Sequence, residues 1–176
     1  LLVIVGDINA GGTQDIAIAR VDFSGVTGTV VNSLNGAITI ADTTMPGGVN
    51  SLNGNIAITN STLTGDGVNS SGGALTIANT SISGGGINTS SGAIGLSRVS
   101  VANPGSNGVN SSSGAVTLVD SAVTGAGSNG VNTSTGAISP GAEIRRCRRG
   151  ASRDGGRSTG RRPNAKTPSN MNASSK

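Results

Sequence analysis

The chain has 176 residues, among them 30 glycines, one aromatic residue (Phe23) and no Trp, Tyr or His. The absence of His excludes catalytic and metal sites that depend on imidazole, and the lack of large side chains argues against a compact globular core. The net charge of +4 is uneven: residues 1–140 hold two arginines against six aspartates, a net charge of −4, and residues 141–176 hold ten Lys and Arg against two acidic residues. We therefore expect no nucleic-acid binding by the acidic body, which has almost no aromatic surface for base stacking.

The chain starts with an aliphatic run, residues 1–5, that is too short to span a bilayer. No apolar run of about 20 residues follows it, so we expect no membrane-spanning segment. The run begins in mid-pattern, without an initiator Met or a charged signal peptide. We interpret the sequence as a fragment of a longer protein.

From residue 7 onward the chain repeats a unit marked by an aliphatic residue followed by Asn. The pairs are Ile8-Asn9, Val31-Asn32, Val49-Asn50, Val68-Asn69, Ile87-Asn88, Val109-Asn110 and Val131-Asn132, at spacings of 18 to 23 residues. A turn rich in Ser, Thr and Gly then leads to an alternating aliphatic strand at 16–18, 38–40, 56–58, 75–77, 94–96 and 116–118. Each strand is followed by a polar residue (Arg20, Asp42, Asn60, Asn79, Arg98, Asp120) and, three residues later, by an apolar one (Phe23, Met45, Leu63, Ile82, Val101, Val123).

This alternation has the period of a β-strand, and no stretch has the apolar spacing of a helix. One unit alone could not bury its apolar side, whereas units stacked as coils about 4.8 Å apart would align the aliphatic residues inside and pair every strand with its neighbours. The sequence therefore predicts an all-β fold, a right-handed parallel β-helix of about seven coils of 18–23 residues. We place this domain at residues 1–140, with the repeats at 7–138.

Asn recurs at the same place in seven coils, which predicts an asparagine ladder. A stacked Asn side chain donates a hydrogen bond to a carbonyl oxygen of the neighbouring coil. Asn also tolerates the left-handed backbone that a tight corner needs, so we expect this column to form a corner of the solenoid. We interpret the column as structural rather than as a ligand site.

The other polar column places opposite charges one coil apart, Arg20 beside Asp42 and Arg98 beside Asp120. Opposite charges at stacked positions stabilise a sheet slightly. Two interpretations stay open, a solvated corner and a catalytic Arg/Asp pair, and we favour the corner.

The pattern V-N-S-x-x-G-A-[IVL]-T-[IL]-x-[DN]-[ST]-x-[IVL]-x-G is clearest at residues 68–84 and 109–125. It resembles the β-helical repeats of large bacterial surface proteins, namely filamentous-haemagglutinin-like exoproteins and autotransporter passengers. The resemblance covers residues 7–138 and implies a right-handed parallel β-helix that is exported, displayed on the cell surface and often adhesive. We therefore expect a structural or display segment of a secreted or cell-surface bacterial protein, adhesin-like and without catalysis, whose partner is a host surface or an extracellular polysaccharide.

The first alternative is a fragment of a β-helical lyase or hydrolase that acts on polysaccharides, because two carboxylates suffice to cleave a glycosidic bond. The six body aspartates are dispersed, the body has no Lys and its turns are short. We therefore predict no catalytic, cofactor or metal site. If Asp22, Asp42 and Arg20 met in a cleft with an inserted loop, the enzyme would become the better interpretation.

The second alternative is an ice-binding face built from Thr-x-Thr rows, for which the best candidate is Thr62-Leu63-Thr64. The equivalent pairs are Thr44/Pro46, Ser81/Ser83, Ser100/Ala102 and Ala122/Thr124. These side chains and the coil lengths vary, which disfavours a lattice match. A calcium-binding repeat is also disfavoured, because Gly65-Asp66-Gly67 occurs once.

The repeat pattern stops at Ser139-Pro140, and residues 141–176 form a basic tail that contains the only cysteine, Cys147. With almost no apolar side chains, this tail is expected to be disordered. It is a native basic tail, a linker, or a product of reading out of frame, and we favour the last. The final coil lacks a clear cap, so we expect self-association through open solenoid ends.

Overall fold

The computed structural model describes residues 2–3, 6–23 and 28–141, and these residues form three parallel β-sheets of seven strands each, with no helix. Sheet A consists of β1 (Leu2–Val3), β4 (Val21–Asp22), β7 (Thr44–Met45), β10 (Thr62–Thr64), β13 (Ser81–Ser83), β16 (Ser100–Ala102) and β19 (Ala122–Thr124). Sheet B consists of β2 (Ile8–Ala10), β5 (Gly28–Ser33), β8 (Gly47–Ser51), β11 (Val68–Ser70), β14 (Ile87–Thr89), β17 (Val109–Ser111) and β20 (Val131–Thr133). Sheet C consists of β3 (Ile16–Ala19), β6 (Ile38–Ala41), β9 (Ile56–Thr59), β12 (Leu75–Ala78), β15 (Ile94–Ser97), β18 (Val116–Val119) and β21 (Ile138–Gly141).

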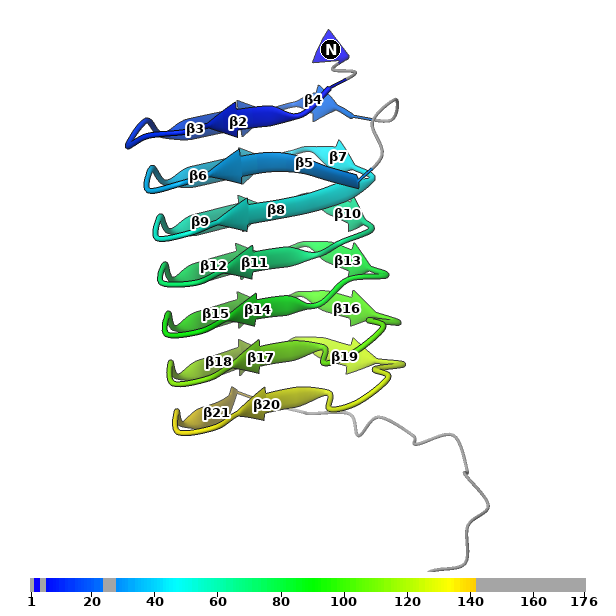
Figure 1. Cartoon of the computed structure of the whole chain (residues 1–176). Helices are drawn as coiled ribbons and strands as arrows, with labels where there is room; N and C mark the ends of the chain where they lie inside the picture. The colour runs from blue at the N-terminus through cyan, green and yellow to red at the C-terminus, as the bar shows by residue number, and fades with distance from the viewer. Residues whose placement is uncertain (1, 4–5, 24–27, 142–176) are drawn as a thin grey trace, which may run out of the picture.

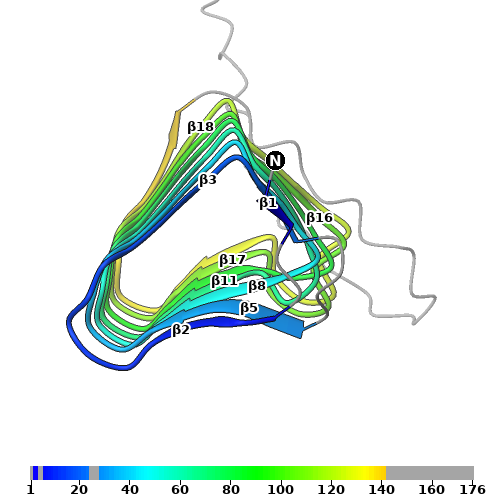
Figure 2. The same ribbon diagram turned by 90° about the horizontal axis from the view of Figure 1, so that it is seen from above.

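The chain visits sheets A, B and C in turn, so that each coil lies directly on the previous one (Figure 1). Seen from the N-terminal end, the cross-section is roughly triangular and the chain runs clockwise as it recedes, which is a right-handed path (Figure 2). The predicted right-handed parallel β-helix of about seven coils is therefore confirmed. Its handedness agrees with the general preference of parallel β-crossovers.

The strands pair at the register that the repeat predicted. In sheet B each aliphatic-Asn pair lies beside the next, as Val68-Asn69 does beside Val49-Asn50 and Ile87-Asn88. One register shift occurs, between Thr29 and Val31 where β5 meets β8. The strands of sheet C are all four residues long. The uneven coil length is therefore taken up outside this sheet, for example in the longer turns at 103–108 and 125–130 that lead from sheet A to sheet B.

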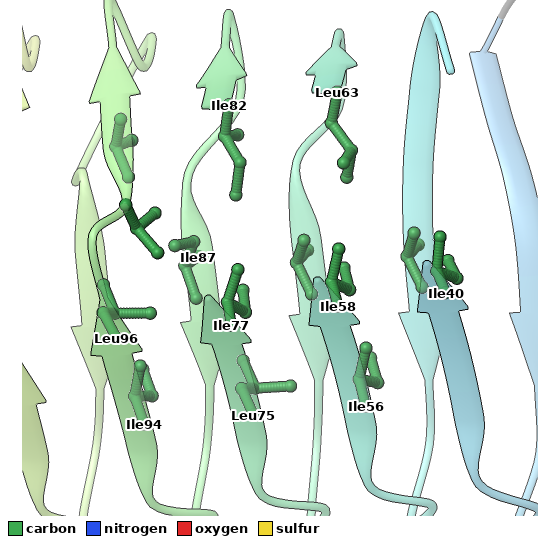
Figure 3. Close-up of a cluster of buried hydrophobic side chains, with 14 of the residues drawn as sticks. Ile40, Ile56, Ile58, Leu63, Leu75, Ile77, Ile82, Ile87, Ile94 and Leu96 are labelled. Carbon is green, nitrogen blue, oxygen red and sulfur yellow. The ribbon is translucent and has the colours of Figure 1, made fainter. Parts of the chain in front are cut away.

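The core consists of columns of aliphatic side chains that stack from coil to coil inside the solenoid (Figure 3). Along a strand of sheet C, alternate residues are buried: Ile56 and Ile58 are buried, while Ala57 and Thr59 face outward. An apolar residue within each strand of sheet A, or directly after it in the case of Phe23, completes the interior, and all six predicted members (Phe23, Met45, Leu63, Ile82, Val101 and Val123) are buried. A narrow interior of this kind is filled by medium-sized side chains, which explains why the chain does without Trp and Tyr.

A column of glycines lets the coils approach closely at the turn between sheets B and C. The column consists of Gly36, Gly54, Gly73, Gly92, Gly114 and Gly136, and a Cβ added at any of them would lie 1.8–2.1 Å from a backbone carbonyl oxygen of the preceding coil. No real Cβ tolerates such a distance. Glycine is therefore required here by the stacking of the coils, not by an unusual φ angle.

The last strand extends beyond the point where the sequence pattern stops. Strand β21 pairs with β18 over four residues, with Pro140 beside Leu118 and Gly141 beside Val119. The strand thus runs one residue past the predicted domain boundary at 140, because a strand at the edge of a sheet accommodates a proline, which lacks an N–H group. The predicted disorder of the basic tail and the position of Cys147 fall on residues 142–176, outside the described residues.

Candidate functional site

The asparagine column lies on the outer face of sheet B and forms the predicted ladder. In β11 the side chains of Val68 and Ser70 are buried and Asn69 between them is half-buried, so the Asn side chain points outward. Asn69 Nδ2 donates to Asn50 Oδ1 at 3.0 Å, and Asn88 Nδ2 donates to Asn69 Oδ1 at 3.0 Å. The same bond joins Asn32 to Asn9 at 2.7 Å, Asn50 to Asn32 at 3.4 Å and Asn132 to Asn110 at 2.7 Å.

These asparagines do not form a corner, and that part of the prediction is wrong. They lie inside the strands of sheet B, and none of them has a positive φ angle. The left-handed corner belongs to the other polar column, between sheets C and A, where six residues have φ angles of 47–57°: Arg20, Asp42, Asn60, Asn79, Arg98 and Asp120. Asn and Asp adopt this conformation more readily than other residues with a Cβ. At Arg20 and Arg98 the stacked coil imposes it.

The corner column also carries a hydrogen-bond ladder, and the direction of its bonds explains where the charges lie. Asn60 Nδ2 donates to Asp42 Oδ1 at 3.2 Å, Asn79 Nδ2 donates to Asn60 Oδ1 at 3.1 Å, and Arg98 Nε donates to Asn79 Oδ1 at 2.5 Å. In every bond the later coil donates to the earlier one. A carboxylate, which only accepts, therefore begins this run at Asp42, and a guanidinium, which only donates, ends it at Arg98.

Of the predicted charge neighbours, Asp42 and Arg98 thus mark the two ends of a ladder run. Asp120 lies one coil beyond Arg98 and Asp42 one coil beyond Arg20. The backbone shows this, because Arg98 N donates to Val119 O and Arg20 N donates to Ala41 O, each in the residue before the aspartate. Arg98 directs its Nε toward Asn79, away from Asp120. This arrangement supports the structural interpretation of the column over a catalytic Arg/Asp pair.

A column of buried hydroxyl groups directly follows the corner residues and was missed at the level of sequence. Its members are Thr43, Ser61, Thr80 and Ser121, each no more than 7% exposed. Each hydroxyl donates to the carbonyl oxygen two residues earlier, as Ser61 Oγ does to Thr59 at 2.7 Å. The hydroxyls of Ser61, Thr80 and Ser121 also accept from the backbone of the previous coil, as Ser61 Oγ does from Thr43 N at 3.2 Å. The recurrent pair of Asn or Asp followed by Ser or Thr was the available signal.

A second hydroxyl column ends the strands of sheet B from β5 to β20 and holds the glycine turn. Ser70 Oγ accepts from Gly73 N at 2.9 Å, and the equivalent residues Thr89, Ser111 and Thr133 accept from Gly92, Gly114 and Gly136. In the second coil Ser33 Oγ instead donates to Gly36 O at 2.8 Å. Ser51 is the exception, because its Oγ is buried and has no partner.

The three residues that would favour an enzyme lie on one corner of the first two coils. Arg20 and Asp42 occupy equivalent exposed positions of neighbouring coils, and Asp22 lies two residues after Arg20, at the register of Thr44. Asp42 is engaged by Asn60 in the ladder. The loop that would have to build a cleft beside them, at 24–27, lies outside the described residues. Over the described residues no group of three or more Asp, Glu, Cys or His is placed to hold a metal ion.

The predicted Thr-x-Thr row lies on the outer face of sheet A. Thr62 and Thr64 are exposed and Leu63 between them is buried. Their neighbours at the same register include Thr44 on one side and Ser81 and Ser83 on the other. The row is thus continuous in backbone but mixed in side chain, and ice binding stays a prediction that thermal hysteresis would test.

The described residues contain no helix long and apolar enough to cross a membrane. Comparison of the chain with models of protein families, with curated proteins and with solved structures finds no match in any of the three.

Proposed function

We propose that the chain is a structural segment of a secreted or cell-surface bacterial protein, a stiff β-helical spacer that displays contact surfaces as adhesins do and catalyses no reaction itself. The observation that carries the proposal is that the polar side chains of the solenoid bond to one another and to the backbone. The asparagine column, the corner column and both hydroxyl columns bond mainly to backbone or to the same position of a neighbouring coil. Polar groups held in this way stabilise a stack and are not free to act on a substrate.

The outer face of sheet C supports a role in contact rather than in chemistry. The outward residues from β3 to β18 are small and uncharged: Ala17, Ala19, Thr39, Ala41, Ala57, Thr59, Thr76, Ala78, Gly95, Ser97, Thr117 and Val119. A face without charged, thiol or imidazole groups offers no general base that could activate its Thr and Ser hydroxyl groups. Together with the resemblance of the repeats to bacterial surface exoproteins, it favours display outside the cell.

Display on a laboratory bacterium tests the proposal. The full chain, with an epitope at its free end, would be fused to a secretion leader and an outer-membrane anchor. We expect the epitope to be accessible on intact cells and attachment to host epithelial cells or polysaccharide-coated surfaces to exceed that of cells displaying the anchor alone. Equal display of the epitope without any added attachment would overturn the adhesin-like part, and failure to reach the surface would overturn the display role.

A separate assay addresses the polysaccharide-acting alternative. The purified chain would be incubated with acidic and neutral polysaccharides, and new reducing ends and unsaturated uronates would be measured. We expect no product. Cleavage that is lost in both Asp42→Asn and Arg20→Gln, but kept in the distant Asp66→Asn, would establish the enzyme instead, because Asp66 is an exposed aspartate in the turn before β11.

A further inference from the structure

The outer face of sheet C is a flat surface of small side chains along the side of the rod. Its strands from β3 to β18 follow nearly parallel lines when seen along the axis (Figure 2). Two outward columns cover this face, one of Ala17, Thr39, Ala57, Thr76, Gly95 and Thr117 and one of Ala19, Ala41, Thr59, Ala78, Ser97 and Val119. None of these residues is buried, and Val119 is 40% exposed. Covering such a face costs little side-chain entropy, because its side chains are short.

The side-chain sizes along each column are complementary about the middle of the face. A second copy turned over about an axis that runs along the strands, between β9 and β12, presents the same columns in reverse order. The first coil, that of β3, then faces the sixth, that of β18, and the third faces the fourth. In all six facing pairs one residue has γ atoms and the other is Ala or Gly: Ala17/Thr117, Thr39/Gly95, Ala57/Thr76, Ala19/Val119, Ala41/Ser97 and Thr59/Ala78. Large side chains opposite small ones let two sheets interdigitate.

The corner column at the edge of this face has the same symmetry in its charges. Its residues directly follow the strands of sheet C, and all of them are exposed. The reversed copy would bring together the corner pairs Arg20/Asp120, Asp42/Arg98 and Asn60/Asn79. Each arginine thus faces an aspartate, and each asparagine faces another amide, with which it can exchange a hydrogen bond.

The bonds within one chain leave these corner groups able to bond to a second copy. Asp42 accepts from Asn60 through Oδ1, and Arg98 donates to Asn79 through Nε. A carboxylate has a second oxygen, and a guanidinium has further donors on its two Nη atoms. Such pairs at the rim of an interface contribute modestly to affinity but determine its orientation and register.

The charges select one orientation and one register of the two copies. A shift by one coil in one direction would place Arg20 opposite Arg98, and a shift in the other direction would place Asp42 opposite Asp120. In both cases Thr39 would also face another threonine instead of a glycine. Two copies that run in the same direction would place the charged corner opposite the glycine turn between sheets B and C. Like charges and facing large side chains therefore disfavour these alternatives.

We propose that two copies of this chain pack side by side and antiparallel through the outer faces of sheet C, with the corner charges paired between the copies. Six coils about 4.8 Å apart and four residues wide give each face an area of roughly 380 Å². With the corners added, the dimer reaches the lower limit of specific interfaces, about 1,000 Å² over both copies, and we expect a micromolar dissociation constant. Because the interface has two-fold symmetry, it closes at the dimer.

This dimer uses the side of the rod and needs neither end of the solenoid, so it is compatible with further coils before the first or after the last. It also does not depend on display at the cell surface. The proposed function and the dimer can therefore each fail while the other stands.

Charge reversal at one corner pair tests the orientation and the register. Arg20→Asp would place two aspartates opposite each other in the dimer, and Asp120→Arg would place two arginines there. We expect each variant alone to dimerise about tenfold more weakly than the wild type, because two ion pairs become repulsions. An equimolar mixture of the two variants should restore association, since the facing charges are again opposite. Asp66→Arg is the matched control, because the exposed Asp66 lies in a turn between sheets A and B and should not affect association.

Ala57→Arg tests the face itself, because a long charged side chain at its centre prevents close contact with Thr76 of a second copy. Thr62→Arg, on the outer face of sheet A, is the control. The full-length variants would be compared by sedimentation equilibrium from micromolar to submillimolar concentration at low ionic strength, with circular dichroism as the check of folding. We expect a reversible dimer for the wild type and Thr62→Arg, and a monomer for Ala57→Arg. A monomeric wild type, association of folded Ala57→Arg equal to that of the wild type, or a charge-reversal mixture that associates no better than its components would each overturn the antiparallel interface.

Discussion

The close stacking of the glycine column makes Gly73→Ala a stringent test of the fold. A Cβ at Gly73 would lie 2.0 Å from Gly54 O and 2.5 Å from Gly54 C, and both atoms belong to the backbone of the preceding coil. Neither can swing away as a side chain would. The turn must therefore move away from the preceding coil by more than 1 Å to restore an ordinary contact. A shift of this size lengthens a hydrogen bond of about 3 Å beyond the range in which it forms.

The cost can be worked out from these contacts. Overpacking of a tightly packed site costs about 1–3 kcal/mol, and the bond from Gly73 N to Ser70 Oγ, which is 2.9 Å long, contributes about 1 kcal/mol more. The lower backbone entropy of the unfolded alanine variant returns about 0.4–1 kcal/mol. We expect a loss of about 2–3 kcal/mol in the free energy of unfolding, measured by urea denaturation of the full chain followed by circular dichroism.

Gly95→Ala is the matched control. Gly95 lies in β15, its φ angle is not positive, and an added Cβ would meet nothing within 4 Å. Here the same substitution should stabilise the chain by about 0.5–1 kcal/mol, because only the entropy of the unfolded state and the strand preference change. If Gly73→Ala is as stable as the wild type, or if both substitutions shift the midpoint equally, the close-approach explanation of the glycine column is refuted.

The hydroxyl columns and the corner ladder give three further expectations, each measured by the same denaturation assay. Ser51→Ala should be neutral or slightly stabilising, because the buried Ser51 Oγ has no partner, whereas Ser70→Ala should cost about 1–2 kcal/mol by leaving an amide unpaired; an equal loss in both would contradict this. Val99→Thr should raise the free energy of unfolding by about 1 kcal/mol, because Val99 interrupts the column in which the hydroxyls of Ser61, Thr80 and Ser121 accept from the coil before. No gain in stability would show that a hydroxyl at this position does not form the bond. Asn60→Asp should cost about 1 kcal/mol or more, since it loses the donor to Asp42 and stacks two carboxylates; recovery in the double variant with Asp42→Asn would confirm the cause.

The strands and the core could be predicted from the sequence because their signal is a strict alternation. In a strand such as Ile56-Ala57-Ile58 the period of two alone decides which residues point inward, and stacking of equal units fixes the register. The burial of Phe23 and Met45 could be predicted in the same way, since each repeats a position that is aliphatic in the other coils. Where the same residue type recurs at the same position of every coil, the repeat alone determines the inward direction and the register.

The position of the corner could not be predicted in this way, because two columns are rich in Asn. Propensity for the left-handed region is shared by Asn69 in sheet B and Asn60 at the corner, yet only Asn60 adopts it. The decision lies with the backbone bonds to the neighbouring coils, which are tertiary. Arg98 shows the strength of this effect, because a residue with no special preference for that region is held there with a φ of 53°.

The directionality of side-chain bonding links the charges of the body to its architecture. Among the residue types of the corner column only Asn can both donate and accept, so the ladder there consists of amides, with an acceptor, Asp42, where it begins and a donor, Arg98, where it ends. Two of the charges of the corner column, those of Asp42 and Arg98, therefore stand at ladder ends. The asparagine column has the same direction, since in each of its bonds, as from Asn32 to Asn9 and from Asn132 to Asn110, the later coil donates to the earlier one.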